Sequence, residues 1–505
     1  MDVRASWHNG GSLVTVLVTG NGDSLAALHA AEAAGTVRFV GISVHPFISI
    51  LDRRKNMNTS VIRRRFLAGA GALGASAVAA ACGLPGSSAG ASKAAAAQGN
   101  VRWSVNVSNP DVQAFWNAMK KGFEDAHPKL SVTIEGYALA QGQTRDDLLF
   151  ATMAAGTAAD AWTHDVTTSY TQPFVEKSAL LALDDYYRTM PNLKKLFPWA
   201  RERARVRGKL YGVPQAAEFI AVYYNKGAFD RAGVKAVPAT WNEFLDVNEK
   251  IKKTGIQPMA VQKERTNPGH NFSTYLMGLI GRTGYEEILF DGKRTWDKEP
   301  GVRQAAETLV TMQKQGYMLL DVLTNETADV KVDFPNGKTG LWITGMWNES
   351  TFQKAKQDNA GFDYDFFALP SQNPSIPQTL AGGLGDGAQV WAQTKNRDGI
   401  VEWIDWSIGP IGQKLRVEMR STVPTVPYTP EDFKVPEQFR RVLRLYINAK
   451  DFGYNLSETL PSDVAQTYWN GIMAILNQKL TPNEWVQQMQ RGWDVAKQQG
   501  KTPQR

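Results

Sequence analysis

Cysteine is nearly absent from this sequence, which has one, Cys82, in 505 residues. A disulfide within the chain is therefore excluded, as is a zinc site built from several thiolates. Histidine is also scarce: beyond residue 99 only His127, His164 and His270 occur, far apart along the chain. Residues 100–505 contain neither a G-x-S-x-G nucleophile motif nor an H-E-x-x-H zinc helix. We therefore expect no metal and no cofactor.

A strong charge of one sign is missing from most of the chain. The formal net charge is +7, from 56 Lys and Arg against 49 Asp and Glu. Residues 1–99 hold nine of the basic and four of the acidic residues, which leaves 47 against 45 in residues 100–505. A nearly balanced surface gives no electrostatic basis for binding nucleic acid, so we expect none. The basic run RERARVRGK, residues 201–209, is typical of a solvated helix face and turn.

One stretch joins arginines to small apolar residues: RRRFLAGAGALGASAVAAAC, residues 63–82. It contains GAGALG, a literal match to the glycine fingerprint of dinucleotide-binding folds. That fingerprint requires a buried strand before its first glycine, and three arginines occupy that place instead. Basic residues, an uncharged run and small residues before a cysteine are the order of an export signal. The uncharged run is too short for a permanent membrane span.

Two details refine the export interpretation. The arginines followed by Phe and Leu resemble a twin-arginine signal, and AAAC resembles a lipobox, in which Cys82 becomes the lipid-carrying N-terminus. Met57 begins a short basic segment, so we expect residues 1–56 to be an upstream extension that is not naturally made. Residues 57–81 would then be the signal peptide and residues 82–99 a flexible Gly/Ser/Ala tether. The protein is expected to be exported and anchored, through lipid on Cys82, to the outer face of the cytoplasmic membrane.

The remaining residues, about 400, are too many for one core and suit two lobes. Residues 101–108 have the composition of a strand, residues 111–128 repeat apolar side chains along one helix face, and residues 130–137 alternate like a second strand. The order strand, helix, strand predicts a parallel sheet with crossover helices. Residues 240–255 and 481–500 each begin with Thr and carry Glu three residues later, which predicts two capped helices.

Three tryptophans lie outside such helical stripes. Trp162 follows an apolar segment in ADAWTHDVTTSY, Trp347 follows a buried-strand pattern in TGLWITGMWNES, and Trp469 lies in DVAQTYWNG. Ligands of open α/β sheets gather at the carboxyl ends of strands, where an aromatic ring can serve as a stacking platform. Packing in the core is equally open for each. Gly345 would let the chain turn close to whatever binds beside Trp347.

Four stretches together resemble the extracellular solute-binding proteins of ABC importers, in the carbohydrate-binding group that includes maltodextrin-binding protein. They are GKLYGVP (208–214), EFIAVYYNKGAFDRAGVKAVPATWNEF (218–244), FPNGKTGLWITGMW (334–347) and LAGGLGDGAQVWAQTKN (380–396). Their order and spacing, together with the lipoprotein-like signal, carry the resemblance. It implies a protein that is not an enzyme, with the two-lobed α/β fold of periplasmic binding proteins (type II).

In that fold each lobe is a mixed sheet flanked by helices, and hinge segments join the lobes. The resemblance implies that the chain crosses between lobes near residues 218–221 and 378–382, where Gly382 and Gly383 tolerate the dihedral changes of a hinge. GGLGDG, residues 382–387, is alternatively an anion-binding loop, although no clear helix start follows it. The expected lobes are residues 100–217 with 380–430, and residues 218–379 with 431–505.

The resemblance also implies ligand-binding residues. Trp162 and Asp165 look like a family segment that meets sugar hydroxyls, and Glu218 matches a carboxylate at the hinge. Trp347 and Trp469 match stacking aromatics. The remaining candidates match more loosely or only by position: Tyr275, Gly383, Asp386, Asn109 and Asp111.

These residue types suit a carbohydrate, because rings cover its C–H faces and carboxylates bond its hydroxyls. The resemblance implies a monomer that delivers a mono- or oligosaccharide to the permease subunits of an ABC transporter. A polyol, a glycerol-phosphate-type ligand or a peptide could use the same fold, although no basic residue is among the candidates, which argues for a neutral ligand. A secreted glycoside hydrolase is the other alternative, using two carboxylates such as Asp160 with Asp165, or Glu218 with Asp386.

Overall fold

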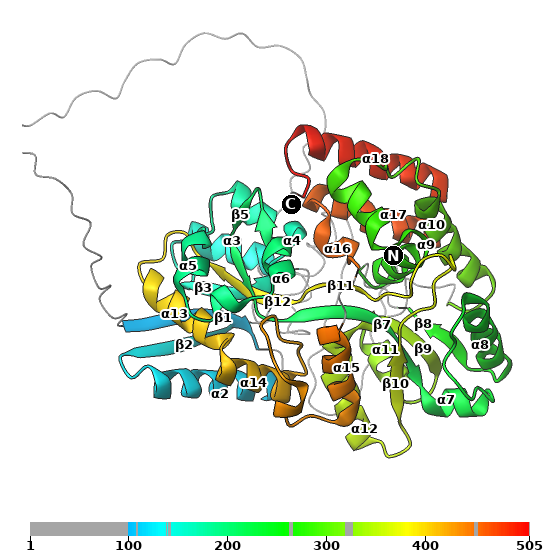
Figure 1. Cartoon of the computed structure of the whole chain (residues 1–505), viewed down its shortest axis with the longest axis horizontal. Coiled ribbons are helices and arrows are strands. Elements are labelled where there is room, and N and C mark those ends of the chain that lie inside the picture. Colours follow the sequence, from blue (N-terminus) through cyan, green and yellow to red (C-terminus); the bar gives the residue numbers. More distant parts are fainter. Residues whose placement is uncertain are drawn as a thin grey trace, which may run out of the picture. The chain divides into compact units, whose positions relative to one another are not determined.

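Two mixed five-stranded sheets organise the described part of the chain (Figure 1). In this computed structural model the described residues are 99–107, 110–137, 139, 143–261, 266–318, 327–448 and 453–503. The expectations for the export signal, Cys82 and Asn109 lie outside these residues. Within the described ranges, no helix has the length and apolar character needed to cross a bilayer.

The first sheet contains the strand, helix, strand unit expected from the sequence. Its order is β2 (Leu130–Tyr137), β1 (Gly99–Asn106), β3 (Ala161–Asp165), β12 (Asp386–Val390) and β6 (Gly212–Pro214). β1 is parallel to β2 and β3, whereas β12 is antiparallel to β3 and β6. Alternate residues of β1, including Trp103, are buried against the apolar face of α2 (Pro110–Ala126). Burial of these apolar faces holds the unit together.

The second sheet forms around a long strand, β7 (Ala217–Asn225). Its order is β10 (Tyr364–Phe367), β7, β9 (Thr339–Gly345) and β8 (Gln257–Ala260), with β11 (Ala381–Leu384) also paired to β7. Two of its helices, α8 (Trp241–Lys253) and α18 (Pro482–Gln498), begin at Thr240 and Thr481 with complete capping boxes. Both helices were predicted from those caps, and both are confirmed.

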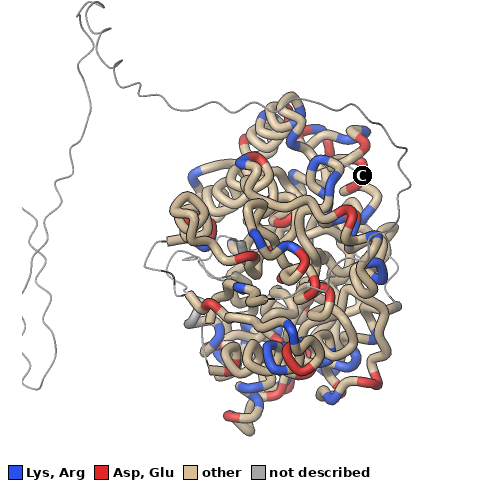
Figure 2. Tube along the Cα trace, turned by 90° about the vertical axis from the view of Figure 1, so that its left-hand side faces the viewer, with Lys and Arg blue, Asp and Glu red and all other residues tan. Residues whose placement is uncertain are grey.

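The helices and short strands not yet introduced are α3 (Arg145–Ala154), α4 (Thr168–Glu176), α5 (Asp184–Thr189), α6 (Pro198–Arg203), β4 (Arg205–Val206), β5 (Lys209–Leu210), α7 (Lys226–Arg231), α9 (Thr266–Glu286), α10 (Pro300–Lys314), α11 (Thr327–Asp333), α12 (Glu349–Asp358), α13 (Arg397–Ser407), α14 (Pro410–Arg420), α15 (Glu437–Asn448), α16 (Leu456–Thr459) and α17 (Ser462–Leu476). Basic and acidic residues are interspersed along the described chain (Figure 2), in keeping with the balanced charge.

The chain changes sheet at two points that lie side by side. One is Gln215 and Ala216, between β6 and β7, and the other is Gly385, between β11 and β12. The N–H of Gly385 donates to the carbonyl of Ala216 at 3.0 Å, and the N–H of Ala216 donates to the carbonyl of Asp386 at 3.0 Å. Backbone hydrogen bonds therefore tie the two crossings together.

These positions correct the expected crossings by a few residues. Residues 218–221 lie inside β7, and residues 381 and 382 already belong to β11, which pairs with β7. The resemblance predicted the crossings to within a few residues. Each crossing lies at the residues where pairing with one sheet ends and pairing with the other begins. The assignment of residues 431–505 to the second lobe stays a prediction.

Candidate functional site

Two adjoining pockets open between the sheets, beside the crossings. They have volumes of about 290 and 280 Å³, and Glu218, Trp347 and Asp386 line both. We call the first the acidic pocket; its other lining residues are Asp165, Tyr170, Asn267, His270, Thr344, Asn455, Ser457 and Glu458. We call the second the arginine pocket; its polar lining also includes Asn106, Tyr137, Arg145, Thr163, Arg416, Arg420 and Thr422. Both sheets supply lining residues, and because the two pockets share three of them we refer to the pair as the cavity.

Strand pairing sets two carboxylates opposite each other. Asp165 ends β3 and Asp386 begins β12, and the two are register partners. Arg145, the first residue of α3, donates from Nη2 to Asp165 Oδ2 at 2.8 Å. Burial opposes the charge of Arg145, but the charges of Asp165 and Asp386, with the hydrogen bond to Asp165, together outweigh it and raise the pKa of Arg145. Burial and then the charge of Asp165 raise the pKa of Asp386.

Two glutamates of the acidic pocket lie in surroundings that favour their protonated forms. Burial, followed by the charge of Asp386, raises the pKa of Glu218 well above its usual value. Burial, followed by the charge of Asp165, raises the pKa of Glu458 to about 8. Asn455 Nδ2 donates to Glu458 Oε1 at 2.8 Å. Near neutral pH the protonated form of Glu458 is therefore favoured, and a protonated carboxyl group can donate as well as accept a hydrogen bond.

Trp347 presents an aromatic surface to the cavity. It lies just after β9, is 39% exposed, and lines both pockets. Its ring packs on the ring of His270, with centroids 5.1 Å apart. Burial lowers the pKa of His270 to about 4, so this imidazole is neutral at pH 7. An exposed indole among hydrogen-bonding groups is suited to a ligand with both apolar and polar faces.

Glycines make room for three of these side chains. A Cβ at Gly345 would collide with the ring of Trp347. A Cβ at Gly383 would collide with the carboxyl group of Glu458, and one at Gly385 with that of Glu218. Gly345 thus makes room for the ring of Trp347. The sequence had predicted that it makes room for a ligand beside Trp347.

Comparison with known proteins decides the family. The family model for bacterial extracellular solute-binding proteins matches residues 106–414, more than half of the chain. The chain belongs to this family.

Among its relatives, this solute-binding protein is 26% identical over 304 residues to a binding protein of Brucella abortus, across 59% of this chain and 70% of that protein. It is 27% identical over 205 residues to the multiple sugar-binding protein of Streptococcus mutans, across 38% of this chain and 46% of that protein. A solved chitin oligosaccharide binding protein superposes with a TM-score of 0.67 and 21% identity, covering 79% of this chain and 99% of the other. The likeness in structure confirms the expected two-lobed α/β fold.

The structure brings four of the predicted site residues to the cavity of this solute-binding protein: Asp165, Glu218, Trp347 and Asp386. Gly383 lies beside Glu458 and lines a neighbouring pocket. Asp111 is exposed in the first turn of α2 and does not line the cavity.

Three aromatic candidates lie in the core instead. Trp162 is completely buried, and its Nε1 donates to Gln389 Oε1 at 2.9 Å. Tyr275 is completely buried and meets Trp241 edge to face, with ring centroids 5.8 Å apart. Trp469 is buried in α17, where its Nε1 donates to Ser457 Oγ at 3.1 Å. Trp162 and Tyr275 therefore fill core space, whereas Trp469 supports a lining residue.

Most of the polar lining could not be predicted from the sequence. Arg145, Arg416 and Glu458 come from three helices far apart in the sequence, so no local pattern unites them. The sequence of residues 455–458 is typical of a helix start, not of a binding site. Asn455 caps α16 by accepting a hydrogen bond from Ser457 N. Within the described residues, no group of three or more His, Cys, Asp or Glu side chains is placed to hold a metal ion.

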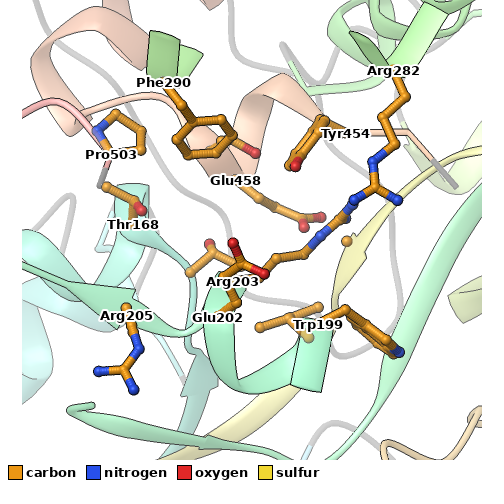
Figure 3. A pocket seen from close by; sticks show the side chains of 14 residues that line it. Thr168, Trp199, Glu202, Arg203, Arg205, Arg282, Phe290, Tyr454, Glu458 and Pro503 are labelled. Atoms are coloured by element: carbon orange, nitrogen blue, oxygen red, sulfur yellow. The ribbon is translucent and has the colours of Figure 1, made fainter. Parts of the chain in front are cut away.

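A narrower pocket on the other side of Glu458 contains a half-buried arginine, Arg203 (Figure 3). Arg203 donates from Nη1 to the carbonyl of Gly382 at 2.9 Å and from Nη2 to that of Gly453 at 3.0 Å. Its guanidinium lies 4.2 Å from the ring centroid of Tyr454. The expectation that residues 201–209 form a solvated helix face and turn is therefore incomplete for Arg203, which is half-buried and donates to the strand beside the crossing.

The segment GGLGDG has a different role from an anion-binding loop. Its residues run from β11 through Gly385 into β12. Gly382 and Gly383 pair with Phe219 and Glu218 of β7, and Gly387 pairs with His164 of β3. Because the segment forms strand pairs rather than the start of a helix, its backbone groups are already engaged.

Proposed function

We propose that this protein captures a sugar, a mono- or oligosaccharide, in the cavity and delivers it to the permease subunits of an ABC transporter. The observation that carries the proposal is the exposed indole of Trp347 beside the carboxyl, amide and hydroxyl groups of the acidic pocket. Sugars present C–H faces that lie on such rings, and hydroxyls that need paired donors and acceptors. Glu218 and Glu458 supply both kinds of hydrogen bond when protonated.

The names of relatives support a carbohydrate. The Streptococcus mutans protein is named for binding multiple sugars, and the solved structure described above is of a protein that binds chitin oligosaccharide. The two pockets are each about 280 to 290 Å³ and share three lining residues. Together they reach the volumes usual for small-molecule sites, and have room for more than one sugar ring.

The crossings support capture by closure. Each crossing between the two sheets is short: one consists of Gln215 and Ala216, and the other of Gly385. The cavity residues Glu218 and Asp386 lie next to these crossings in the sequence. Small rotations there would move Trp347 of the second sheet toward Asp165 of the first and enclose a ligand. We further propose that the protein acts as a monomer, held outside the cytoplasmic membrane by lipid on Cys82.

The experiment is a thermal-shift screen against neutral and acidic sugars, polyols, glycerol phosphate and peptides, followed by calorimetry with the best ligand. A ligand that binds only the folded protein raises its melting temperature. We expect sugars to do so, and Glu218→Gln to weaken binding, since this change keeps the shape but replaces an oxygen that can accept a hydrogen bond by an NH2 group that can only donate. Stabilisation by peptides or polyols alone would contradict the proposal. A reducing-sugar assay completes the test, because turnover of a bound glycan would identify a glycoside hydrolase instead.

A further inference from the structure

The arginine pocket contains a guanidinium group that lacks hydrogen-bond acceptors in the described structure. Arg416, in α14, is only 4% exposed, and its Nε and Nη2 atoms are buried with no hydrogen-bond acceptor among the described residues. The guanidinium lies 5.6 Å from the ring centroids of both Phe115 and Trp116 on α2, so aromatic rings hold it in place. A buried charged donor left without an acceptor is costly to a protein unless a bound group completes it.

Two further orphaned donors line the same pocket. The Oγ1 atoms of Thr163, in β3, and Thr422, just after α14, are buried and have no hydrogen-bond partner in the described structure. Buried polar groups are normally paired, and unpaired ones mark places where something else is bound. Three such side chains from two separate parts of the chain converge on one pocket, which indicates a site for an acceptor-rich group.

The charges of the pocket show which sign that group carries. Arg145 is balanced by Asp165, its partner at 2.8 Å. Arg416 and Arg420 form no ion pair with any described acid, and Asp386 is the carboxylate whose charge acts on Arg416. Burial lowers the pKa of Arg416 only to about 10, so it remains charged at pH 7. Glu218 also lines the pocket, but burial raises its pKa and so favours its neutral form. Two unpaired arginines beside Asp386 then leave this end of the cavity with an excess positive charge.

We propose that the arginine pocket binds an anionic substituent of the sugar, a carboxylate or a phosphate, through Arg416 and Arg420. The planar guanidinium of Arg416 can form paired hydrogen bonds with either group, and the hydroxyls of Thr163 and Thr422 can donate to its remaining oxygens. The inference rests on the proposed function and specifies its substrate class. It departs from the neutral ligand expected from the sequence, where no pattern joined these arginines to the other site residues.

The test compares sugars with and without an anionic group. Calorimetry on the intact protein would use galacturonate trimer against its methyl ester, galacturonate against galactose, and glucose 6-phosphate against glucose. We expect the anionic member of at least one pair to bind about 10- to 100-fold more tightly, the range for hydrogen bonds to a charged group. Which pair shows the difference identifies carboxylate or phosphate. Its advantage should shrink as salt is added.

Variants assign the effect to the pocket. Arg416→Gln and, at the more exposed position, Arg420→Gln should each remove most of the preference for the anion, measured as the ratio of the affinities for the anionic and the neutral sugar. Arg491→Gln, on the exposed face of α18, changes net charge equally and should leave the preference intact. Circular dichroism and the melting temperature check that each variant folds.

The possible failures are distinguishable. If neutral sugars bind and their anionic counterparts bind no better, the inference is wrong and the proposed function stands. The same holds if the preference for the anion survives in both Arg416→Gln and Arg420→Gln. If no sugar of either charge binds, the proposed function is wrong, and the inference that depends on it falls as well.

Discussion

The ring of Trp347 lies over Gly345, so closely that a Cβ at position 345 would collide with it. Gly345→Ala should therefore displace the indole from the cavity without touching a ligand directly. We expect the sugar affinity to fall about as far as in Trp347→Ala, and the protein to remain folded. Calorimetry with the best ligand from the screen measures the affinity, and tryptophan fluorescence reports whether the ring has moved.

A control for this change is available on a helix. Gly492, in α18, has room for a Cβ, with no neighbouring atom nearer than 3.8 Å. Gly492→Ala should leave the affinity unchanged and raise the free energy of unfolding by roughly 0.5–1 kcal/mol, since alanine favours a helix over glycine. Unaltered affinity in Gly345→Ala would show that the ring can adapt or that it does not contact the ligand.

Substitutions of two tryptophans should affect binding and stability differently. Trp347→Ala should cost about 1–3 kcal/mol of binding free energy, the range for losing an apolar side chain from a contact, and little stability. Trp162→Ala should cost about 3–5 kcal/mol of unfolding free energy, because it leaves a cavity in the core, while the folded fraction binds normally. Urea unfolding and calorimetry on both variants check this. Equal effects of the two substitutions on affinity would contradict these assignments.

The raised pKa of Glu458 predicts how stability varies with pH. Its usual value is 4.5 and its value in the fold is about 8. Between these pH values the unfolded chain releases the proton and the folded protein retains it, so this carboxyl group makes the protein less stable as pH rises toward 8. Below pH 4.5 both states are protonated and no stability is lost. Glu458→Gln removes the titration, and the gap in melting temperature between variant and wild type should therefore widen from pH 5 to pH 8.

The size of that gap is moderate because Glu458 borders the cavity, where solvent screens its charge. We expect the melting temperature of the variant minus that of the wild type to be about 1–3 °C larger at pH 8 than at pH 5. Differential scanning calorimetry without ligand measures it. Asp147→Asn, at an exposed helix cap, is the control. Hydrogen bonds to Thr144 lower the pKa of Asp147 from its usual 3.8, so this carboxyl group is ionised in both the folded and unfolded states from pH 5 to pH 8, and the gap for this variant should stay constant. A gap that narrows toward pH 8 in Glu458→Gln would contradict the assignment.

The export proposal is tested at the cysteine. Cys82→Ala should prevent lipid attachment, so the protein would move from the membrane fraction to the soluble extracytoplasmic fraction. Labelling with a radioactive fatty acid and fractionation of an expressing bacterium measure both effects. Lipid incorporation that persists in Cys82→Ala would rule out this cysteine as the anchor.

Much of the fold followed from local patterns. The capping boxes at Thr240 and Thr481 specify helices on their own, because the side chains that satisfy the first backbone N–H groups are three residues apart. The point where the chain changes sheet could not be fixed in this way. It depends on where pairing with β7 and β3 ends, and those partners lie about 165 to 220 residues away from Gly385.

The site was predicted less completely than the fold. Trp162 and Trp347 gave the same local signal, an aromatic residue near a strand end, yet one is completely buried and the other is 39% exposed. The difference arises because Trp162, inside β3, packs in a small hydrophobic cluster with Phe174, whereas Trp347 lies after the end of β9. Arg416 gave no signal at all, since a lone arginine in a helix usually faces solvent, and only the tertiary packing of α14 on α2 buries it.

A crystal structure with the sugar that raises the melting temperature most is the measurement that tests the central claim most directly. We predict a sugar ring lying on the indole of Trp347, with its hydroxyls hydrogen-bonded to Glu218 and Asp386. Density for the sugar at another place on the protein, or an empty cavity at saturating ligand, would contradict the account.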